Sequence, residues 1–409
     1  MRRKLSFIPV AFAFVAAGCT GTTVSPTATP EVSTPEASPS PSEPAPTASA
    51  SAGPDPAAGE WVRALEFADG ESQVVGDSIV YGSAGYLAIG SRWMGFEGGP
   101  RPTGYVAWHS GDGRDWEEVP FPTDFGELTV QELTVSADGD FIFYAIKPAN
   151  DPTQPELVTL RSSDGVAWEE LESGLPEETF VQQVERGPRG YLLVAGQARD
   201  TNPALWLSAD GLSWEQVHEF EQTDTFIQLD DAGGGAEGYV VLGRRIATEG
   251  TAYQRFAFAS ADGREWFTAE EPFGPDDQGW VFSTTVASTG PDWIATLGQP
   301  DGAPTAVWFS ENGLDWTEHG SLDAPPNTSP GALADTGIGL FFGVSGSSPF
   351  EGFPGFWSSS DGATWEEVDL GADAWITGLA ESPGNVAVIG AVPNEPFASS
   401  AGIWIRSTE

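Results

Sequence analysis

The chain has 409 residues, of which 60 are Asp or Glu and 17 are Lys or Arg, so its formal net charge is −43. This acidity argues against a nucleic-acid partner, because such affinity comes from Lys and Arg that neutralise phosphates, and we expect it to aid solubility. The chain holds a single cysteine, which excludes an intramolecular disulfide.

Residues 1–18 have the organisation of an export signal, with three basic residues followed by an apolar run from Leu5 to Ala17. The run is too short to remain in a bilayer as a spanning helix. Residues 16–19, Ala-Ala-Gly-Cys, resemble the bacterial lipobox, in which cleavage before the cysteine accompanies its lipidation. The resemblance predicts lipid attachment at Cys19 and anchoring to the outer face of the bacterial cell membrane. An ordinary secretory signal with an incidental cysteine is the alternative.

Residues 19–58 consist almost entirely of Ser, Thr, Pro, Ala, Gly and Glu after the cysteine. Such a segment buries too little apolar surface to offset its chain entropy, so we expect a disordered tether. At about 3.1 Å per residue in an extended polyproline-like conformation, it spans on the order of 100 Å. The folded domain is expected to comprise residues 59–409.

Six segments of this domain share the pattern Ser-x-Asp/Asn-Gly-x-x-Trp: 110–116, 162–168, 208–214, 260–266, 310–316 and 359–365. Their tryptophans are 46 to 52 residues apart, a period typical of repeat architectures. The acidic or amide side chain caps backbone N–H groups and the glycine adopts a positive φ, so each segment is predicted to be a hairpin turn. A second bulky apolar residue stands eight positions before each corner tryptophan, and we expect both to fill the space between sheets.

Each repeat is expected to contain four strands. Two flank the corner, such as ALWLS before it and WEQV after it; the other two are a Gly-led apolar run such as GYLLVAG and a less regular strand such as FVQQVE. The Gly-led run occurs seven times. Four antiparallel strands repeated around an axis are the blades of a β-propeller.

The two ends of the folded region supply the seventh corner. Trp404 matches the bulky residue before a corner, and Trp61 matches the corner tryptophan with its outgoing strand. The N-terminal strand should therefore complete the last blade beside three C-terminal strands, which closes the ring without a free sheet edge. The prediction is an all-β, seven-bladed β-propeller of four-stranded antiparallel blades, with the register of closure open by one residue.

The repeated corner resembles the Asp-box, the repeat of bacterial sialidases and many other β-propellers. The family pattern is Ser-x-Asp-x-Gly-x-Thr-Trp, and the corners of this chain are one residue shorter and mostly lack the threonine. The resemblance covers residues 59–409 and implies corners that lie away from the central pocket. It therefore implies turn roles, without chemistry, for Asp112, Asp164, Asp210, Asp262 and Asp361.

Residues that the resemblance would require for a sialidase are missing. Those enzymes have an arginine triad, an Arg-Ile-Pro signature and six blades, whereas Arg245-Ile246 is followed here by Ala247 and seven blades are expected. The Gly-x-Ser-x-Gly, His-Glu-x-x-His and Gly-x-x-x-x-Gly-Lys motifs are absent, and His109, His218 and His319 stand in different repeats. We assign no catalytic residue, cofactor or metal site from the sequence.

A ligand-binding face is expected at the end of the central channel opposite the corners, where the loops between second and third strands open. The longest loop, residues 91–103, holds Arg92, Trp93 and Arg101, and other loops hold Arg244, Arg245 and Trp280. Aromatic and arginine side chains in an acidic molecule suit a carbohydrate, peptide or protein ligand. Packing of long loops against the rim explains the same residues equally well.

These patterns favour an exported lipoprotein that displays a propeller as a binding or assembly module. The alternative is a divergent sialidase-like glycoside hydrolase, and a periplasmic folding or assembly factor would share the same organisation. A hydrolase needs two convergent carboxylates, but 60 acidic residues supply many pairs. The residues that line the central channel therefore distinguish these functions better than any motif.

Overall fold

The computed structural model describes residues 59–68, 73–96, 99–122, 128–147, 156–196, 202–222, 225–247, 253–274, 284–298, 304–323, 329–345, 355–395 and 398–408. The predicted export signal, Cys19 and the tether lie outside these ranges. All described regular elements are β-strands. Within the same ranges, no helix has the length and apolar character that crossing a membrane requires.

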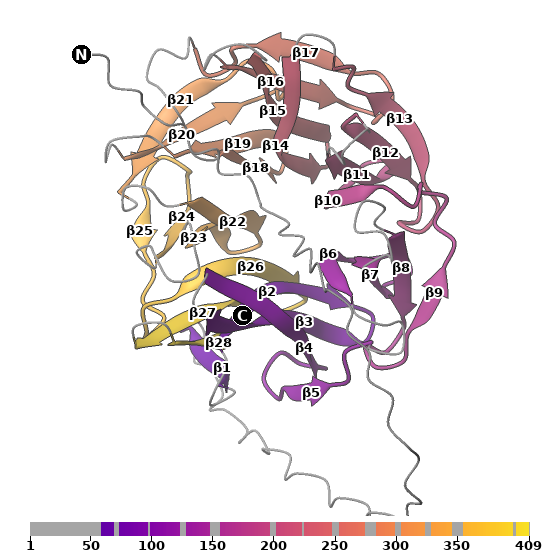
Figure 1. The fold of residues 1–409 in the computed structure, drawn as a ribbon. Coiled ribbons are helices and arrows are strands. Elements are labelled where there is room, and N and C mark those ends of the chain that lie inside the picture. The colour runs from indigo at the N-terminus through magenta and orange to yellow at the C-terminus, as the bar shows by residue number, and fades with distance from the viewer. Residues whose placement is uncertain are drawn as a thin grey trace, which may run out of the picture.

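The strands form seven four-stranded antiparallel sheets around a common centre (Figure 1), which confirms the predicted fold class. Each sheet is one blade, and its first strand lies nearest the central channel. Blade one contains β2 (Gln73–Gly82), β3 (Gly85–Phe96), β4 (Gly99–Ser110) and β5 (Glu117–Val119). Blade two contains β6 (Thr129–Val135), β7 (Phe141–Lys147), β8 (Glu156–Ser162) and β9 (Glu169–Leu171).

The next four blades follow in chain order, each again running outward from the centre. Blade three contains β10 (Phe180–Gly187), β11 (Gly190–Gly196), β12 (Ala204–Ser208) and β13 (Glu215–Glu219). Blade four contains β14 (Thr225–Gly235), β15 (Gly238–Ala247), β16 (Tyr253–Ser260) and β17 (Phe267–Glu270). Blade five contains β18 (Thr284–Thr289), β19 (Asp292–Leu297), β20 (Thr305–Ser310) and β21 (Thr317–Leu322), and blade six contains β22 (Ser329–Thr336), β23 (Gly339–Ser345), β24 (Phe356–Ser359) and β25 (Glu366–Glu367).

Blade seven joins the two ends of the domain. It contains β26 (Trp375–Ser382), β27 (Asn385–Glu395), β28 (Ala398–Ser407) and, as its outermost strand, β1 (Val62–Phe67). Arg63 lies opposite Trp404, just as Gln216 lies opposite Trp206 in blade three. Because Gln216 and Arg63 each stand two residues after the tryptophan at the corner position, the predicted closure is confirmed and its register is fixed.

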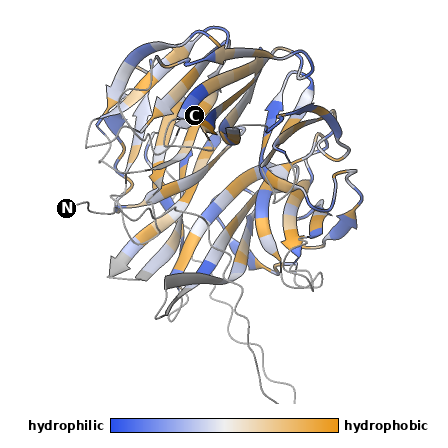
Figure 2. Ribbon diagram, turned by 45° about the horizontal axis from the view of Figure 1, so that its top comes forward, coloured by the Kyte–Doolittle hydropathy of each residue, from blue (hydrophilic) through white to orange (hydrophobic). Residues whose placement is uncertain are grey.

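Hydrophobic packing between blades seals the ring. Seven clusters of buried side chains each join two neighbouring blades. The cluster between blades seven and one combines Ile389 and Ile403 with Tyr86 and Trp108. Figure 2 shows hydrophobic and hydrophilic residues interspersed over the strands. The second strands, such as β7 and β15, begin with five and six consecutive buried residues, as expected when both faces of a sheet pack against neighbouring blades. The predicted packing role of the bulky residues is confirmed, since Trp108 is 1% and Trp404 0% exposed.

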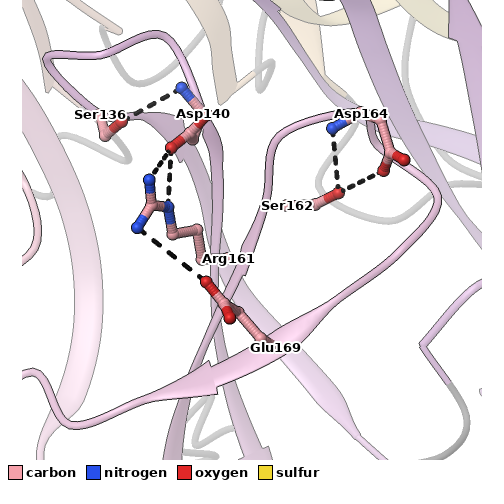
Figure 3. A network of polar contacts seen from close by, with 6 residues as sticks. All are labelled: Ser136, Asp140, Arg161, Ser162, Asp164 and Glu169. Atoms are coloured by element: carbon pink, nitrogen blue, oxygen red, sulfur yellow. Dashed lines mark hydrogen bonds and ion pairs between the residues drawn. The ribbon is translucent and has the colours of Figure 1, made fainter.

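The corner of blade two shows how the repeated motif forms its turn. The Ser162 hydroxyl donates to Asp164 Oδ1 at 3.0 Å (Figure 3), and the same carboxylate oxygen accepts backbone N–H bonds from Val166 and Ala167 at 2.9 and 2.8 Å. Those N–H groups, that of Ala167 first, hold the pKa of Asp164 below its ordinary value. Gly165 has a φ of +76°, which favours glycine.

The other five corners repeat these bonds, and in one of them the amide oxygen of Asn312 takes the place of the carboxylate. The predicted turn role of the corner residues is confirmed. In blade two an ion pair braces the corner further, because Arg161 Nε donates to Asp140 Oδ2 at 2.7 Å and an Arg161 guanidinium nitrogen lies 4.0 Å from Glu169 (Figure 3). The corners are therefore structural elements of the outer ring.

Candidate functional site

The first strands of all seven blades enclose a central channel with a volume of about 1470 Å³. These strands are β2, β6, β10, β14, β18, β22 and β26. On the side of blade one, Ser91 and Trp93 of β3 and Tyr105 of β4 extend the wall. Polar side chains make up much of the channel lining.

Bulges in the inner strands bring six residues, five of them polar, to equivalent positions of the channel wall. Six of the seven first strands shift register against their partner by one residue, whereas β18 pairs without a shift. A bulge bends its strand and re-aims a side chain that regular pairing would direct elsewhere. The extra residues all line the channel, and they are Asp77, Gln131, Gln182, Asp230, Gly331 and Thr377.

Side chains of the bulges bond one blade to the next. Thr377 donates to the carbonyl oxygen of Gly76 at 2.6 Å, which joins blade seven to blade one. Gln182 donates to the carbonyl oxygen of Leu229 at 2.8 Å, which joins blade three to blade four. The accepting residues, Gly76 and Leu229, each stand just before the bulge residue of the neighbouring blade. At these two interfaces the inner wall is thus held by hydrogen bonds between blades as well as within each blade.

Three carboxyl groups from three consecutive blades line the channel: Glu132 on β6, Glu185 on β10 and Asp231 on β14. Burial raises the pKa of Glu185 to about 8, with a further contribution from the charge of Asp231. Burial raises the pKa of Asp231 to about 6, although Thr285 and the N–H of Val286 donate to it at 2.5 and 2.7 Å and favour its ionised form. All three are enclosed by the ring of blades, yet each keeps part of its surface open to the channel.

Glu132 of β6, the third member, differs from the other two in its surroundings. Its pKa lies well above the ordinary value because of burial first and then the charges of Glu185 and Asp231. Among the described residues none donates a hydrogen bond to its carboxylate. By contrast, Gly234 N–H donates to Glu185 at 3.2 Å. We call Glu132, Glu185 and Asp231 the channel triad.

Further carboxylates surround the channel triad. Burial raises the pKa of Asp77 to about 7, and Ser91 Oγ donates to it at 3.0 Å. Burial also raises the pKa of Asp335, on β22. Asp230 is paired with Arg244, whose Nη2 lies 2.7 Å from its Oδ1, and both side chains are nearly buried. No lysine or arginine occurs among the described residues that line the channel, so the ionisable side chains of its described lining are acidic groups and Tyr105.

The structure places the predicted ligand-binding residues in three different settings. Trp93 lines the channel, and its indole Nε1 donates to Ser91 Oγ at 2.6 Å, so the serine bridges it to Asp77. Arg244 lies behind the wall in its pair with Asp230. These two predicted residues are therefore associated with the channel.

Arg92 and Arg245 instead form ion pairs with the outermost strands of their blades. Arg92 Nη2 lies 3.5 Å from Glu118 on β5, and Arg245 Nη1 lies 2.5 Å from Glu270 on β17. Arg245 also stacks over the ring of Phe256, with its Cζ 4.6 Å from the ring centroid. The fourth arginine candidate, Arg101, belongs to β4, but its side chain lies outside the described part, as does Trp280 entirely.

The channel triad was not predicted from the sequence. Nothing distinguishes Glu132, Glu185 and Asp231 locally from the other acidic residues of a chain that has 60 of them. A usable signal does exist in the first strands, because adjacent polar residues such as Gln182-Gln183 and Asp230-Asp231 separate two buried apolar residues by two positions, where regular alternation would separate them by one. Such an interruption is typical of a bulge.

Three solved structures similar to this fold come from different sources. A protein of unknown function from Dyadobacter fermentans is 14% identical with a TM-score of 0.45, and the match covers 86% of this chain and 99% of that one. The sialidase of Trypanosoma rangeli is 15% identical with a TM-score of 0.43 over 70% and 56% of the two chains. An α-L-arabinanase of Penicillium chrysogenum is 12% identical with a TM-score of 0.44 over 85% and 98%.

No protein-family model matches the sequence, and no curated protein matches it. At identities of 15% or less, the similar structures carry no information about the ligand or activity of this chain.

Proposed function

We propose that the protein is an exported, lipid-anchored binding module whose ligand occupies the central channel. The observation that carries this proposal is the channel itself, with about 1470 Å³ of space and a wall of fixed polar side chains contributed by seven blades. Ligand sites are concave, largely formed in advance and equipped with a few well-placed polar groups. The interblade hydrogen bonds supply that rigidity.

The channel chemistry suits a ligand that is rich in hydroxyl or amino groups. The channel carboxyl groups can accept hydrogen bonds and, where protonated, donate them, and Trp93 and Tyr105 add aromatic side chains on one side. The described lining offers an anionic ligand no lysine or arginine, and any ionised carboxylate there repels it. A carbohydrate or another polyhydroxylated or amine-bearing compound therefore fits better than a phosphorylated or carboxylated one.

Binding is tested by thermal unfolding in the presence of neutral, amino and anionic oligosaccharides. A ligand of the folded state at 100 times its Kd stabilises it by about 2.7 kcal/mol, which raises the unfolding midpoint. Trp93→Ala should weaken binding, whereas Phe267→Ala, which changes a 55% exposed ring on the outermost strand of blade four, should not. Absence of any stabilising compound, or stabilisation by anionic compounds alone, would contradict the proposal.

The anchoring part of the proposal has its own test. Cys19→Ala should move the protein from the membrane fraction to the soluble exported fraction, because lipidation requires the cysteine thiol. Retention of the variant in the membrane fraction would contradict lipid anchoring while leaving the channel proposal intact.

A glycoside hydrolase is the second candidate, favoured by one specific observation. The charge of Asp231 contributes to the raised pKa of Glu185, and pKa values of about 8 for Glu185 and about 6 for Asp231 leave the first protonated and the second ionised near neutral pH. An acid and a base with separated pKa values are what glycoside hydrolysis uses. A panel of 4-nitrophenyl glycosides tests this candidate, and turnover that falls at least a hundredfold in Glu185→Gln would support it. If no member of the panel is hydrolysed, the hydrolase candidate fails and the binding module remains the proposed function.

A further inference from the structure

We infer that Asn312, at the corner of blade five, is a latent deamidation site that the folded corner keeps inert. The chain contains a single Asn-Gly pair, Asn312-Gly313, at the position that Asp-Gly pairs occupy in the other five corners. Asn312 is exposed to solvent, whereas Gly313 is buried. The inference concerns the scaffold and is independent of what the channel binds.

Deamidation requires three atoms of this pair to move. The backbone nitrogen of Gly313 attacks the side-chain carbon Cγ of Asn312, the bond from Cγ to Nδ2 breaks, and ammonia leaves with the proton of the Gly313 N–H. Water then opens the five-membered imide at one of its two carbonyl groups, which gives aspartate or, with the main chain running through the side chain, isoaspartate. A glycine after the asparagine favours the attack because no Cβ obstructs it.

The corner fixes the attacking nitrogen. The Gly313 N–H donates to Ser310 Oγ at 2.8 Å, and the Gly313 carbonyl oxygen accepts a bond from the indole Nε1 of Trp316 at 3.0 Å. Gly313 has a φ of +74°, and it packs so closely against blade four that an added Cβ would collide with the Val240 side chain. The nitrogen therefore cannot turn toward Cγ unless these contacts break.

The side-chain amide of Asn312 is fixed at both of its ends. Its Oδ1 accepts backbone N–H bonds from Leu314 and Asp315, both at 2.9 Å, and the Ser310 hydroxyl donates to it at 3.1 Å. Its Nδ2 donates to Asp315 Oδ2 at 2.9 Å. An amide whose acceptor and donor are both engaged cannot rotate into the imide geometry without losing these bonds. The corner thus restrains both reacting partners.

Local opening of this corner would release the pair, and the reaction would then make the opening permanent. Proteins open locally at a lower cost than global unfolding, and chemical modification of an open state prevents its return. An aspartate at position 312 would restore the turn, as Asp164 shows in blade two. An isoaspartate adds one carbon atom to the main chain, so the side-chain bonds of the turn could not form again in register.

The test follows Asn312 by peptide mass spectrometry in full-length protein kept at pH 8.5 and 37 °C, where deamidation adds about one dalton. The folded wild-type protein should react at least tenfold more slowly than the same chain unfolded in guanidinium chloride. Ser310→Ala removes the acceptor of the Gly313 N–H and should raise the rate in the folded protein at least threefold. Ser260→Ala makes the equivalent change in blade four, where the acceptor distance is also 2.8 Å, and should leave the rate at Asn312 unchanged.

Unfolding midpoints show whether both variants fold. If Ser310→Ala does not, Trp316→Phe takes its place, because it removes the indole bond to Gly313 and should also raise the rate. Equal rates in the folded and unfolded wild-type protein, or a faster reaction in the folded protein, would overturn the inference. Equal acceleration by Ser310→Ala and Ser260→Ala would overturn it too, because protection would then come from overall stability and not from the corner of blade five.

Discussion

Replacing Glu185 with glutamine should stabilise the protein, and the gain should depend on pH. The folded state raises the pKa of this carboxyl from its ordinary 4.5 to about 8 because of burial and the charge of Asp231. A folded state that holds a proton which the unfolded chain releases becomes less stable as pH rises. The wild-type protein should therefore lose stability from about pH 4.5 up to about pH 8, and Glu185→Gln should abolish this part of the loss.

The magnitude follows from the two pKa values. Each tenfold change in proton affinity corresponds to about 1.4 kcal/mol, which sets an upper bound of about 5 kcal/mol above pH 8 and about 3 kcal/mol at pH 7. Glu185 keeps part of its surface open to the channel, and solvent there screens its charge, so we expect roughly 1–3 kcal/mol at pH 8. Near pH 4.5 the pH-dependent part of the difference should vanish, leaving only a constant cost, because Gln183 and Gly234 each donate to a different oxygen of Glu185 and glutamine keeps one accepting oxygen.

The assay is denaturant unfolding of both proteins between pH 4.5 and 9, with Glu366→Gln on the exposed strand β25 as the charge-matched control. The free energy of unfolding of the control should depend on pH in the same way as that of the wild-type protein. A Glu185→Gln variant that is less stable than the wild type at pH 8, or whose stability falls with pH as steeply, would refute the reasoning.

Three further substitutions test the scaffold by thermal unfolding. Asp164→Ala should cost about 1–2 kcal/mol through loss of its turn bonds, whereas Asp164→Asn should be milder because Asn312 makes the same bonds; equal losses would contradict this. Trp404→Ala should cost about 3–5 kcal/mol, since the ring is fully buried and bonds Leu370 at 3.0 Å, and a loss below 1 kcal/mol would argue against closure. Gly113→Ala should destabilise the protein far more than Gly111→Ala, because Gly113 has a φ of +79° and an added methyl group there meets the Ile405 side chain, whereas at Gly111 it meets open space. Similar unfolding midpoints for the two variants would contradict this prediction.

Much of the fold follows from chemistry that is local in the sequence. The turn at Asp164 needs only the serine two residues before it and the N–H groups that follow, so six copies of the motif identify six corners. The seven Gly-led runs and the matching ends give the number of blades and the closing strand. The sequence could not fix the register of closure, because the outgoing strand and Trp404 lie at opposite ends of the domain, and only their pairing places Arg63 opposite Trp404.

The channel depends on contacts that no local pattern encodes. Glu132, Glu185 and Asp231 lie about one repeat apart in the chain and meet because successive inner strands stand side by side around the ring. Whether an arginine stays near the channel or is neutralised elsewhere also depends on its neighbours in space, as Arg244 pairs with Asp230 while Arg245 pairs with Glu270. The sequence by itself determined the repeat and the ring, because turns and alternation act over a few residues. The tertiary structure decided which acidic groups share the low-dielectric interior, because burial and charge coupling act through space.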